Sequence, residues 1–322
     1  MPQITRICLI LAALLLAHLG PAAAAPPPVL ALVHGRLIDG TGAAPIDDAA
    51  VLIAGERITA VGRSGEIAIP KDARRIDLRG ATILPGFFNA HVHGGFDARN
   101  LETWAQAGVT TVRDLGIGGN RVQEMLAFRD RELKQPRYAR LLSAGPMLGV
   151  PGGYGALFVT SAADARAKVN DLIDAGVDQI KICLEDGYAG VSGLPKPSAE
   201  EIQAMIEAAH ARGKTVVAHI TQSAYLRYLL DFKVDEFAHL PYDWLTDTDI
   251  ARIAAKGIRL TPTFTVYRNY GAAAACGVEL DLGSVEKGKI ADLLVVEGDP
   301  LQDLGCLENV RLVVHYGAII RE

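Results

Sequence analysis

The feature that most constrains this chain is an alternation of strand-like and helix-like segments between residues 82 and 271. Short apolar runs alternate with stretches that have the period of an amphipathic helix, such as residues 161–175, 199–212 and 248–256, with Ser198 as a candidate N-cap. The candidate strands are residues 82–89, 110–113, 141–144, 179–183, 215–219, 236–240 and 259–265. Repeated strand–helix units predict a parallel sheet with right-handed crossovers.

The number of these units favours an α/β fold of the (β/α) TIM-like barrel type over a doubly wound sheet. The first candidate strand is also not followed by the glycine pattern of a dinucleotide fold. A complete eight-unit barrel takes about 250 residues, and the alternating region is shorter than that. Because no eighth strand follows residues 259–265, we expect an incomplete barrel. Its two unpaired edges favour a homo-oligomer.

Both ends of the chain have a different character from the middle. Residues 29–77 and 291–314 hold short β-branched runs separated by turn residues, without a helical period. This pattern predicts a small β-sandwich domain built from both termini, residues 26–81 and 278–322, beside a barrel domain of residues 82–277.

Residues 1–25 have the pattern of an export signal. A single charge at Arg6 precedes the apolar run 7–19, and the alanines of segment 21–25 suit a cleavage site. The alternative is a membrane anchor, but a spanning helix needs about 20 apolar residues. We therefore expect an exported protein, periplasmic or secreted, with no membrane association after cleavage.

Composition excludes several other classes of protein. Half of the residues are hydrophobic, which is too many for a disordered chain. The formal net charge of −5 argues against nucleic acid as a partner. The 4 cysteines form no CxxC pair, so a disulfide scaffold is not expected, and we interpret them mainly as small buried apolar residues.

Two histidines end the first candidate strand of the barrel. His91 and His93 are two residues apart, so both side chains point to the same side of a strand. In barrels of this type the active site lies at the carboxyl ends of the strands. The pair predicts a metal site there, although two histidines at this spacing also occur in structural roles.

A lysine lies inside another candidate strand. Lys181 is flanked by apolar residues, and a buried amine is costly unless it is neutral, paired or modified. One alternative is that it extends outward or pairs with Asp178 or Glu185. The other is that a neutral Lys181 near a metal reacts with carbon dioxide to give a carbamate, an oxygen ligand that can bridge two cations.

Two further histidines, His219 and His239, end successive candidate strands. Together with His91, His93 and Lys181 they would converge on one barrel mouth, where nitrogen and oxygen donors suit zinc. Asp114 also ends a strand, and we favour a structural role for it, as a partner of Arg113 or a turn cap. Tyr154, in a glycine-rich loop after the third strand, either contacts substrate or packs on its loop.

With these residues in place, the chain resembles the amidohydrolase superfamily, in particular its imidazolonepropionase-like and prolidase-like branch. The resemblance rests on residues 33–42, 84–93, 108–114 and 283–296, and on the strand ends that carry Lys181, His219 and His239. It implies a metal-bearing barrel beside a β-sandwich and hydrolysis of a C–N bond in a small amide, cyclic amide or peptide-like substrate.

The resemblance also implies roles for the five donors. His91 and His93 would bind one divalent metal ion and His219 and His239 a second, with carboxylated Lys181 as the bridge. In the family an aspartate at the end of strand eight binds metal and transfers the proton, and this chain lacks the Gly-Thr-Asp run that carries it.

The other aspartates near the end of the barrel region belong to the connection after the sixth strand or to the approach to the sandwich, so none of them is expected to take the strand-eight role: Asp243, Asp247, Asp249, Asp281 and Asp292. The resemblance without this residue predicts an amidohydrolase of reduced activity. The alternatives are a non-catalytic, metal-binding member of the family and a truncated gene product.

The export signal generates the first test. We expect the secreted protein to begin close to Ala25, because cleavage there removes residues 1–25. Mass spectrometry of the purified secreted chain measures its N-terminus, and an intact Met1 would contradict export.

Overall fold

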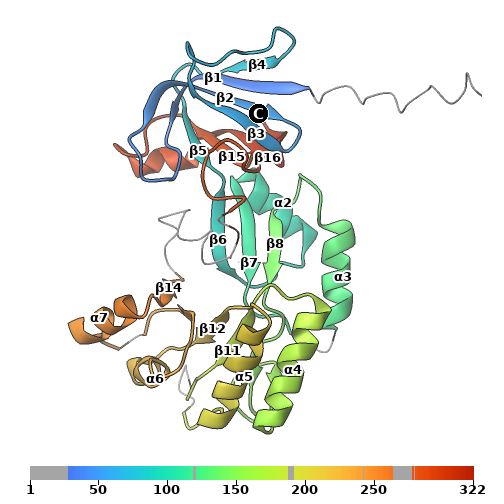
Figure 1. Cartoon of the computed structure of the whole chain (residues 1–322), viewed down its shortest axis with the longest axis vertical. Coiled ribbons are helices and arrows are strands. Elements are labelled where there is room, and N and C mark those ends of the chain that lie inside the picture. Colours follow the sequence, from blue (N-terminus) through green and yellow to red (C-terminus); the bar gives the residue numbers. More distant parts are fainter. Residues whose placement is uncertain (1–27, 119–120, 188–191, 242, 264–277, 279) are drawn as a thin grey trace, which may run out of the picture.

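The computed structural model describes residues 28–118, 121–187, 192–241, 243–263, 278 and 280–322. Figure 1 shows a β-rich part, built from the two ends of the chain, above an α/β part built from the middle. The predicted signal segment, the alanine-rich stretch after residue 263 and Cys276 lie outside the described residues.

The ends of the chain form one eight-stranded sheet in the order β17-β16-β15-β5-β1-β2-β3, with β4 paired to β1. Its strands are β1 (Val29–Leu37), β2 (Ile46–Ala54), β3 (Arg57–Arg63), β4 (Arg74–Asp77), β5 (Thr82–Pro85), β15 (Leu293–Val296), β16 (Val310–His315) and β17 (Ala318–Arg321). One face buries a core that includes Leu32, Ile53, Ile83 and Leu293. The two termini thus share one sheet, while a two-layered sandwich stays a prediction.

The middle of the chain forms two parallel sheets, in the orders β6-β7-β8 and β10-β9-β11-β12-β13-β14. Their strands are β6 (Phe87–Val92), β7 (Val109–Asp114), β8 (Arg140–Ser143), β9 (Leu148–Gly149), β10 (Leu157–Phe158), β11 (Ile180–Cys183), β12 (Val216–His219), β13 (Glu236–Ala238) and β14 (Arg259–Thr261). The two sheets meet where Asp178 N–H donates to Ser143 O at 2.8 Å.

Six of the seven predicted barrel strands are therefore present as parallel strands within a few residues of the predicted bounds, and the second half of the first is present as β6. In the described part of the chain, no strand pairs with the outer edge of β6 or of β14. The expected absence of strand eight concerns the segment that follows β14, which lies outside the described residues.

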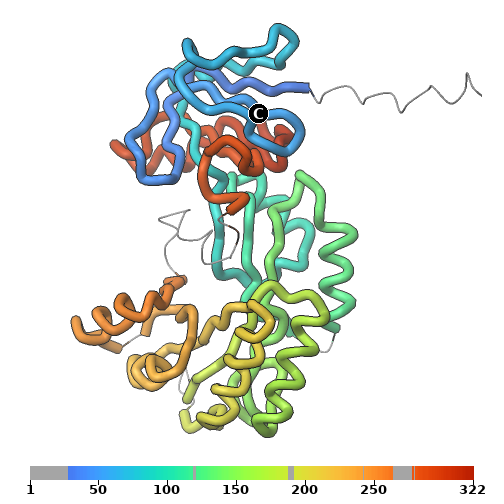
Figure 2. Tube along the Cα trace, in the orientation of Figure 1, coloured from blue at the N-terminus to red at the C-terminus, as the bar shows by residue number. Residues whose placement is uncertain are grey.

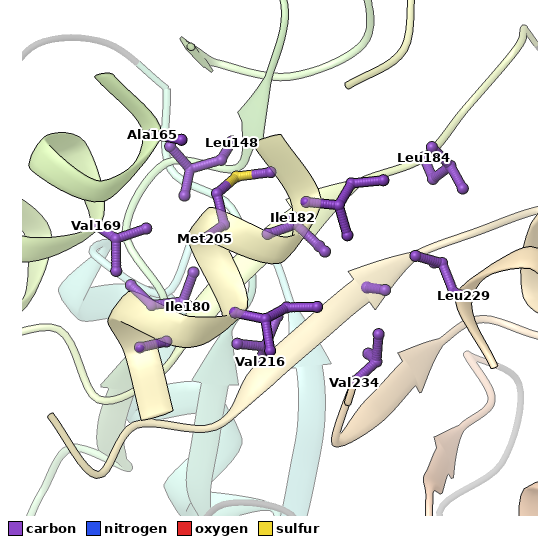
Figure 3. Packing of buried hydrophobic residues seen from close by; sticks show 14 of the residues in the cluster. Leu148, Ala165, Val169, Ile180, Ile182, Leu184, Met205, Val216, Leu229 and Val234 are labelled. Atoms are coloured by element: carbon purple, nitrogen blue, oxygen red, sulfur yellow. The ribbon is translucent and has the colours of Figure 1, made fainter. Parts of the chain in front are cut away.

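Helices lie between the strands, as Figure 2 shows along the chain trace. They are α2 (Ala98–Gln106), α3 (Val122–Glu132), α4 (Ala162–Ala175), α5 (Ala199–Ala211), α6 (Ser223–Leu229) and α7 (Asp247–Ala255). The predicted N-cap Ser198 is confirmed, and its hydroxyl accepts from Glu201 N–H within a capping box. Met205 of α5 packs with Ile182 and Val216 of the adjacent strands (Figure 3).

The first predicted barrel strand, residues 82–89, is corrected by the structure. The segment divides at Gly86: β5 pairs with β15 of the terminal sheet, whereas β6 pairs with β7 of the barrel part. Gly86 N–H donates to Asp292 O, and Phe87 N–H then donates to Gly108 O. A Cβ at Gly86 would lie 2.3 Å from Thr110 Oγ1, so only glycine permits this change of partner.

A buried polar network joins the terminal sheet to the barrel part. Asp292 Oδ1 lies 2.8 Å from His315 Nδ1, and Arg140 Nη1 donates to Asp292 Oδ2 at 2.9 Å. His315 Nε2 lies 3.1 Å from Tyr138 O. Burial acts to raise the pKa of Asp292, but the charges of Arg140 and His315 outweigh it and hold that pKa below its ordinary value.

Two other expectations bear on the fold. Cys183 and Cys306 are buried and unbridged, as predicted for small apolar residues. Among the described residues, none of the helices combines the length and the apolar character needed to cross a membrane.

The network at the junction generates a stability prediction. We expect Asp292→Asn to lower the free energy of unfolding by about 3–5 kcal/mol, because it leaves buried Arg140 without its counter-charge. Since the folded state lowers the pKa of Asp292, this contribution is complete at pH 7 and is lost as acid protonates the carboxylate.

Urea denaturation at pH 7 measures the difference. Asp281→Asn is the matched control, because it removes one half of an exposed ion pair, Arg57–Asp281, and exposed pairs contribute about 0–1 kcal/mol. Equal stability of the two variants would contradict the prediction.

Candidate active site

The first two histidines lie at the end of β6. His91 is within the strand and His93 follows it by one residue, and their ring centroids are 5.3 Å apart. His93 Nδ1 lies 3.0 Å from Gly116 O, after the end of β7. A proton on Nδ1 would leave His93 Nε2 as the nitrogen with a free lone pair.

The other two histidines complete a continuous cluster. His219 ends β12 and His239 follows β13, with a left-handed backbone φ of 73° at His239. The ring centroids of His239 lie 4.6 Å from His91 and 4.8 Å from His219. The structure thus brings together all four histidines predicted from the strand ends.

Lys181 lies in β11, next to β12 in the sheet, and its side chain points into the molecule. The residue is 1% exposed, and its Nζ is buried without a hydrogen-bond partner. Asp178 binds Arg129 and Glu185 binds Thr221, so neither is the partner considered from the sequence. The alternative of an outward or paired lysine is therefore wrong.

Burial favours the neutral form of Lys181 and of three of the histidines. It lowers the pKa of Lys181 to about 7, because the charged amine loses its hydration. Burial, with the charge of Lys181 as the second cause, lowers the pKa of His91 to about 2, of His219 to about 3 and of His239 to about 4. Neutral imidazoles keep a lone pair for a cation or a proton.

The four histidine rings form a connected cluster of contacts, but they are not arranged as the coordination shell of a metal ion. Within the described residues, no three His, Cys, Asp or Glu side chains are grouped in a way that could hold one metal ion. The donor chemistry nevertheless suits a divalent cation, because the buried Nδ1 of His91 and Nζ of Lys181 both lack partners.

Tyr154 lies against this cluster. Its ring stacks on that of His219, with centroids 4.9 Å apart and planes inclined by 29°. The sequence left open whether Tyr154 contacts substrate or packs on its loop, and the structure places its ring on a candidate ligand.

Beneath the cluster, Arg113 of β7 joins strands of both sheets. Its Nε donates to Ala90 O at 2.7 Å, and its Nη1 donates to Gln179 Oε1 at 2.8 Å and to Glu236 Oε2 at 3.0 Å. Thr261 Oγ1 donates to Glu236 Oε1 at 2.6 Å. Arg113 and Glu236 are both fully buried.

Sequence reasoning missed this network. The sequence suggests Arg113 only as a partner of Asp114. In the structure Asp114 instead accepts from the backbone N–H groups of Gly95 and Gly116. These contacts support the structural role favoured for Asp114. The sequence does contain an indication of this network. Glu236 is a charged residue that begins an otherwise apolar strand, and Lys181 is a charged residue within another.

The aspartates excluded from the strand-eight role have other positions. Asp243 accepts from Ser223 N–H and Oγ, at the start of α6. Asp249 binds Arg227, Asp247 begins α7, Asp281 pairs with Arg57 and Asp292 lies in the junction network.

Comparison with known proteins decides the family. Residues 82–271, more than half of the chain, match the amidohydrolase family. This chain belongs to the amidohydrolase family. Members of that family typically use divalent metal ions and small-molecule substrates.

Curated relatives of this amidohydrolase are similar over limited lengths. A deacetylase of Agrobacterium fabrum is 32% identical over 150 residues, which are 45% of this chain and 34% of the deacetylase. An imidazolonepropionase of Pseudomonas savastanoi pv. phaseolicola is 23% identical over 302 residues, 90% of this chain and 61% of the relative. The chain thus spans between a third and three fifths of these two proteins.

Solved structures support the barrel. A putative prolidase from Bifidobacterium longum has a TM-score of 0.75 at 24% identity and covers 92% of this chain and 96% of its own. A Xaa-Pro dipeptidase with bound methionine has a TM-score of 0.74 at 20% identity, covering 91% and 100%. The predicted amidohydrolase superfamily is confirmed by the family match, imidazolonepropionases and prolidases are among the similar proteins, and the solved neighbours imply a TIM-like barrel.

The buried network of this amidohydrolase generates a second stability prediction. We expect Arg113→Met to cost about 3–5 kcal/mol of unfolding free energy, because buried Glu236 then loses the guanidinium that bonds to both of its oxygens and is left with the longer 3.9 Å contact to Arg259. The double variant Arg113→Met/Glu236→Gln should lose less than the sum of the single variants, since it removes both charges.

Urea denaturation of the two single variants and the double variant measures the coupling. Arg121→Met, which breaks an exposed pair with Glu124, is the control and should leave stability unchanged. Additive losses would show that Arg113 and Glu236 do not depend on each other.

Proposed function

We propose that this chain is an exported, metal-dependent hydrolase of C–N bonds, with one or two divalent ions at the barrel mouth, zinc being the best fit. His91, His93, Lys181, His219 and His239 would be the ligands. The substrate would be a small amide, cyclic amide or peptide-like compound, consistent with the deacetylase, imidazolonepropionase and Xaa-Pro dipeptidase among its relatives.

The observation that carries the proposal is the buried, unpartnered amine of Lys181, whose charge acts on His91, His219 and His239. A buried polar atom without a partner destabilises the fold by about 1–3 kcal/mol. An amine kept at such a position is therefore expected to have a role other than stabilising the fold. Attack of the neutral amine on carbon dioxide forms an N–C bond and releases a proton. The resulting carbamate would give the cluster two oxygen donors in place of the unpartnered nitrogen.

The donor set fits zinc in the type of its donor atoms. Imidazole nitrogens and carboxylate-like oxygens are zinc ligands, and catalytic zinc sites keep one position open for water. When bound, the metal would supply a hydroxide near neutral pH and polarise the scissile carbonyl group.

The chain's own residues would set the surroundings of the reaction. Tyr154 stacks on His219, and this contact supports a role for Tyr154 in substrate binding. Asp243, Asp249, Asp281 and Asp292 are all held by other residues, so none of them offers the acid of the missing strand-eight aspartate. Because such a group contributes about 10²–10⁴-fold, we propose slow turnover.

The same observation favours a second candidate function. A protein that keeps the ligand cluster without a proton donor would bind metal and not hydrolyse substrate. A truncated gene product, in contrast, would hold no stoichiometric metal.

Metal content and a substrate screen separate these outcomes. We expect the purified protein to contain one or two zinc ions and to hydrolyse a member of a set of N-acyl amino acids, Xaa-Pro dipeptides and cyclic amides. Lys181→Met should lose bound zinc and at least about 100-fold in rate, because the bridging oxygens disappear.

His210→Gln is the matched control, since His210 is on a helix and paired with Asp235, and it should retain both properties. Zinc without hydrolysis would support the non-catalytic alternative. Absence of zinc from the natural protein would contradict the proposed function.

A further inference from the structure

We infer that Glu185 is a positioning residue: its buried carboxylate fixes His219 as the tautomer protonated on Nε2, so that Nδ1 is the nitrogen presented to the metal. This inference rests on the proposed function for the metal itself, whereas the tautomer can be tested without it. Glu185 follows β11 by two residues and belongs to none of the ligand positions predicted from the sequence.

The contact is direct and excluded from solvent. Glu185 Oε2 lies 3.3 Å from His219 Nε2, with side-chain exposures of 0% for the glutamate and 11% for the histidine. The two residues come from the ends of neighbouring strands, because Cys183 of β11 is paired with His219 of β12.

Two other groups hold the carboxylate in place. Thr221 Oγ1 donates to Glu185 Oε2 at 2.6 Å, and Gly187 N–H donates to Oε1 at 2.9 Å. Both oxygens therefore act as acceptors, so the proton between Glu185 and His219 belongs to the imidazole. A neutral imidazole with its proton on Nε2 has its free lone pair on Nδ1.

This arrangement is how proteins commonly orient a metal-binding histidine. The ligand donates its second N–H to a carboxylate, which fixes the ring and raises the basicity of the coordinating nitrogen, and loss of that partner typically costs about 10–100-fold in metal affinity. Here the stacked Tyr154 ring constrains the plane of His219 while Glu185 constrains its rotation within that plane.

Three variants make the role measurable. Glu185→Met removes the acceptor at similar length, and Glu185→Gln keeps an acceptor oxygen without the charge. Asp235→Asn is the matched control, because it alters a carboxylate–histidine pair, Asp235–His210, outside the cluster.

The first measurement is the nitrogen NMR spectrum of metal-free protein labelled at histidine, with the His219 signals assigned from a His219→Gln variant. We expect His219 to be protonated on Nε2 in the natural protein and to lose this preference in Glu185→Met. In Glu185→Gln the backbone N–H of Gly187 takes the single amide oxygen, so the NH2 group faces Nε2 and the ring proton should move to Nδ1. A proton on Nδ1 in the natural protein, or the same tautomer in Glu185→Met, would overturn the inference.

The second measurement is zinc affinity by competition with a chromogenic chelator. We expect Glu185→Met to bind zinc about 10–100-fold more weakly. Glu185→Gln should lose at least as much, because its amide NH2 group would leave the ring proton on Nδ1, and Asp235→Asn should bind zinc as the natural protein does. Unchanged affinity in Glu185→Met or in Glu185→Gln would overturn the inference.

The two measurements separate this inference from the proposed function. If the natural protein binds no zinc, the proposed function fails, while the spectrum of the metal-free protein still decides whether Glu185 sets the tautomer.

Discussion

The guanidinium group of Arg113 is the interaction on which the geometry of the candidate site depends. It bonds to Ala90, Gln179 and Glu236, which precede His91, Lys181 and His239 by one, two and three residues respectively. Strands of the two parallel sheets are thereby connected through the interior, in addition to the backbone bonds between neighbours. In the described part of the chain, where β6 and β14 share no backbone ladder, this connection fixes the distance between ligands of different strands.

The same interaction explains why Lys181 has no counter-charge. Glu236 is a carboxylate whose charge reaches Lys181, but both of its oxygens accept from Arg113 and one also accepts from Thr261. A guanidinium matches a carboxylate through two parallel bonds, which a lysine cannot do. Burial lowers the pKa of the Lys181 amine to about 7, so a nucleophilic neutral fraction is present near neutral pH.

The sequence predicted those features that depend on local pattern. Alternating apolar strands and amphipathic helices revealed the parallel units, and histidines at strand ends revealed the cluster, because equivalent strand ends meet at one mouth. The partners of Arg113 and Glu185 were not predictable, since they depend on side-chain rotamers and on packing between distant segments. The division of the first barrel strand was missed for a related reason: the apolar run continues through Gly86, and only the change of pairing partner reveals two strands.

The division at Gly86 makes the pairing of β5 depend on a strand that lies near the end of the chain. β5 is held along all four of its residues by β15, a strand near the end of the chain, and a single glycine separates it from the strand that carries His91. Until β15 is made, β5 has only its shorter pairing with β1, through Thr82 and Ile83. A chain that stops before residue 293 would therefore contain every candidate ligand and lack the longer of the two pairings that hold β5.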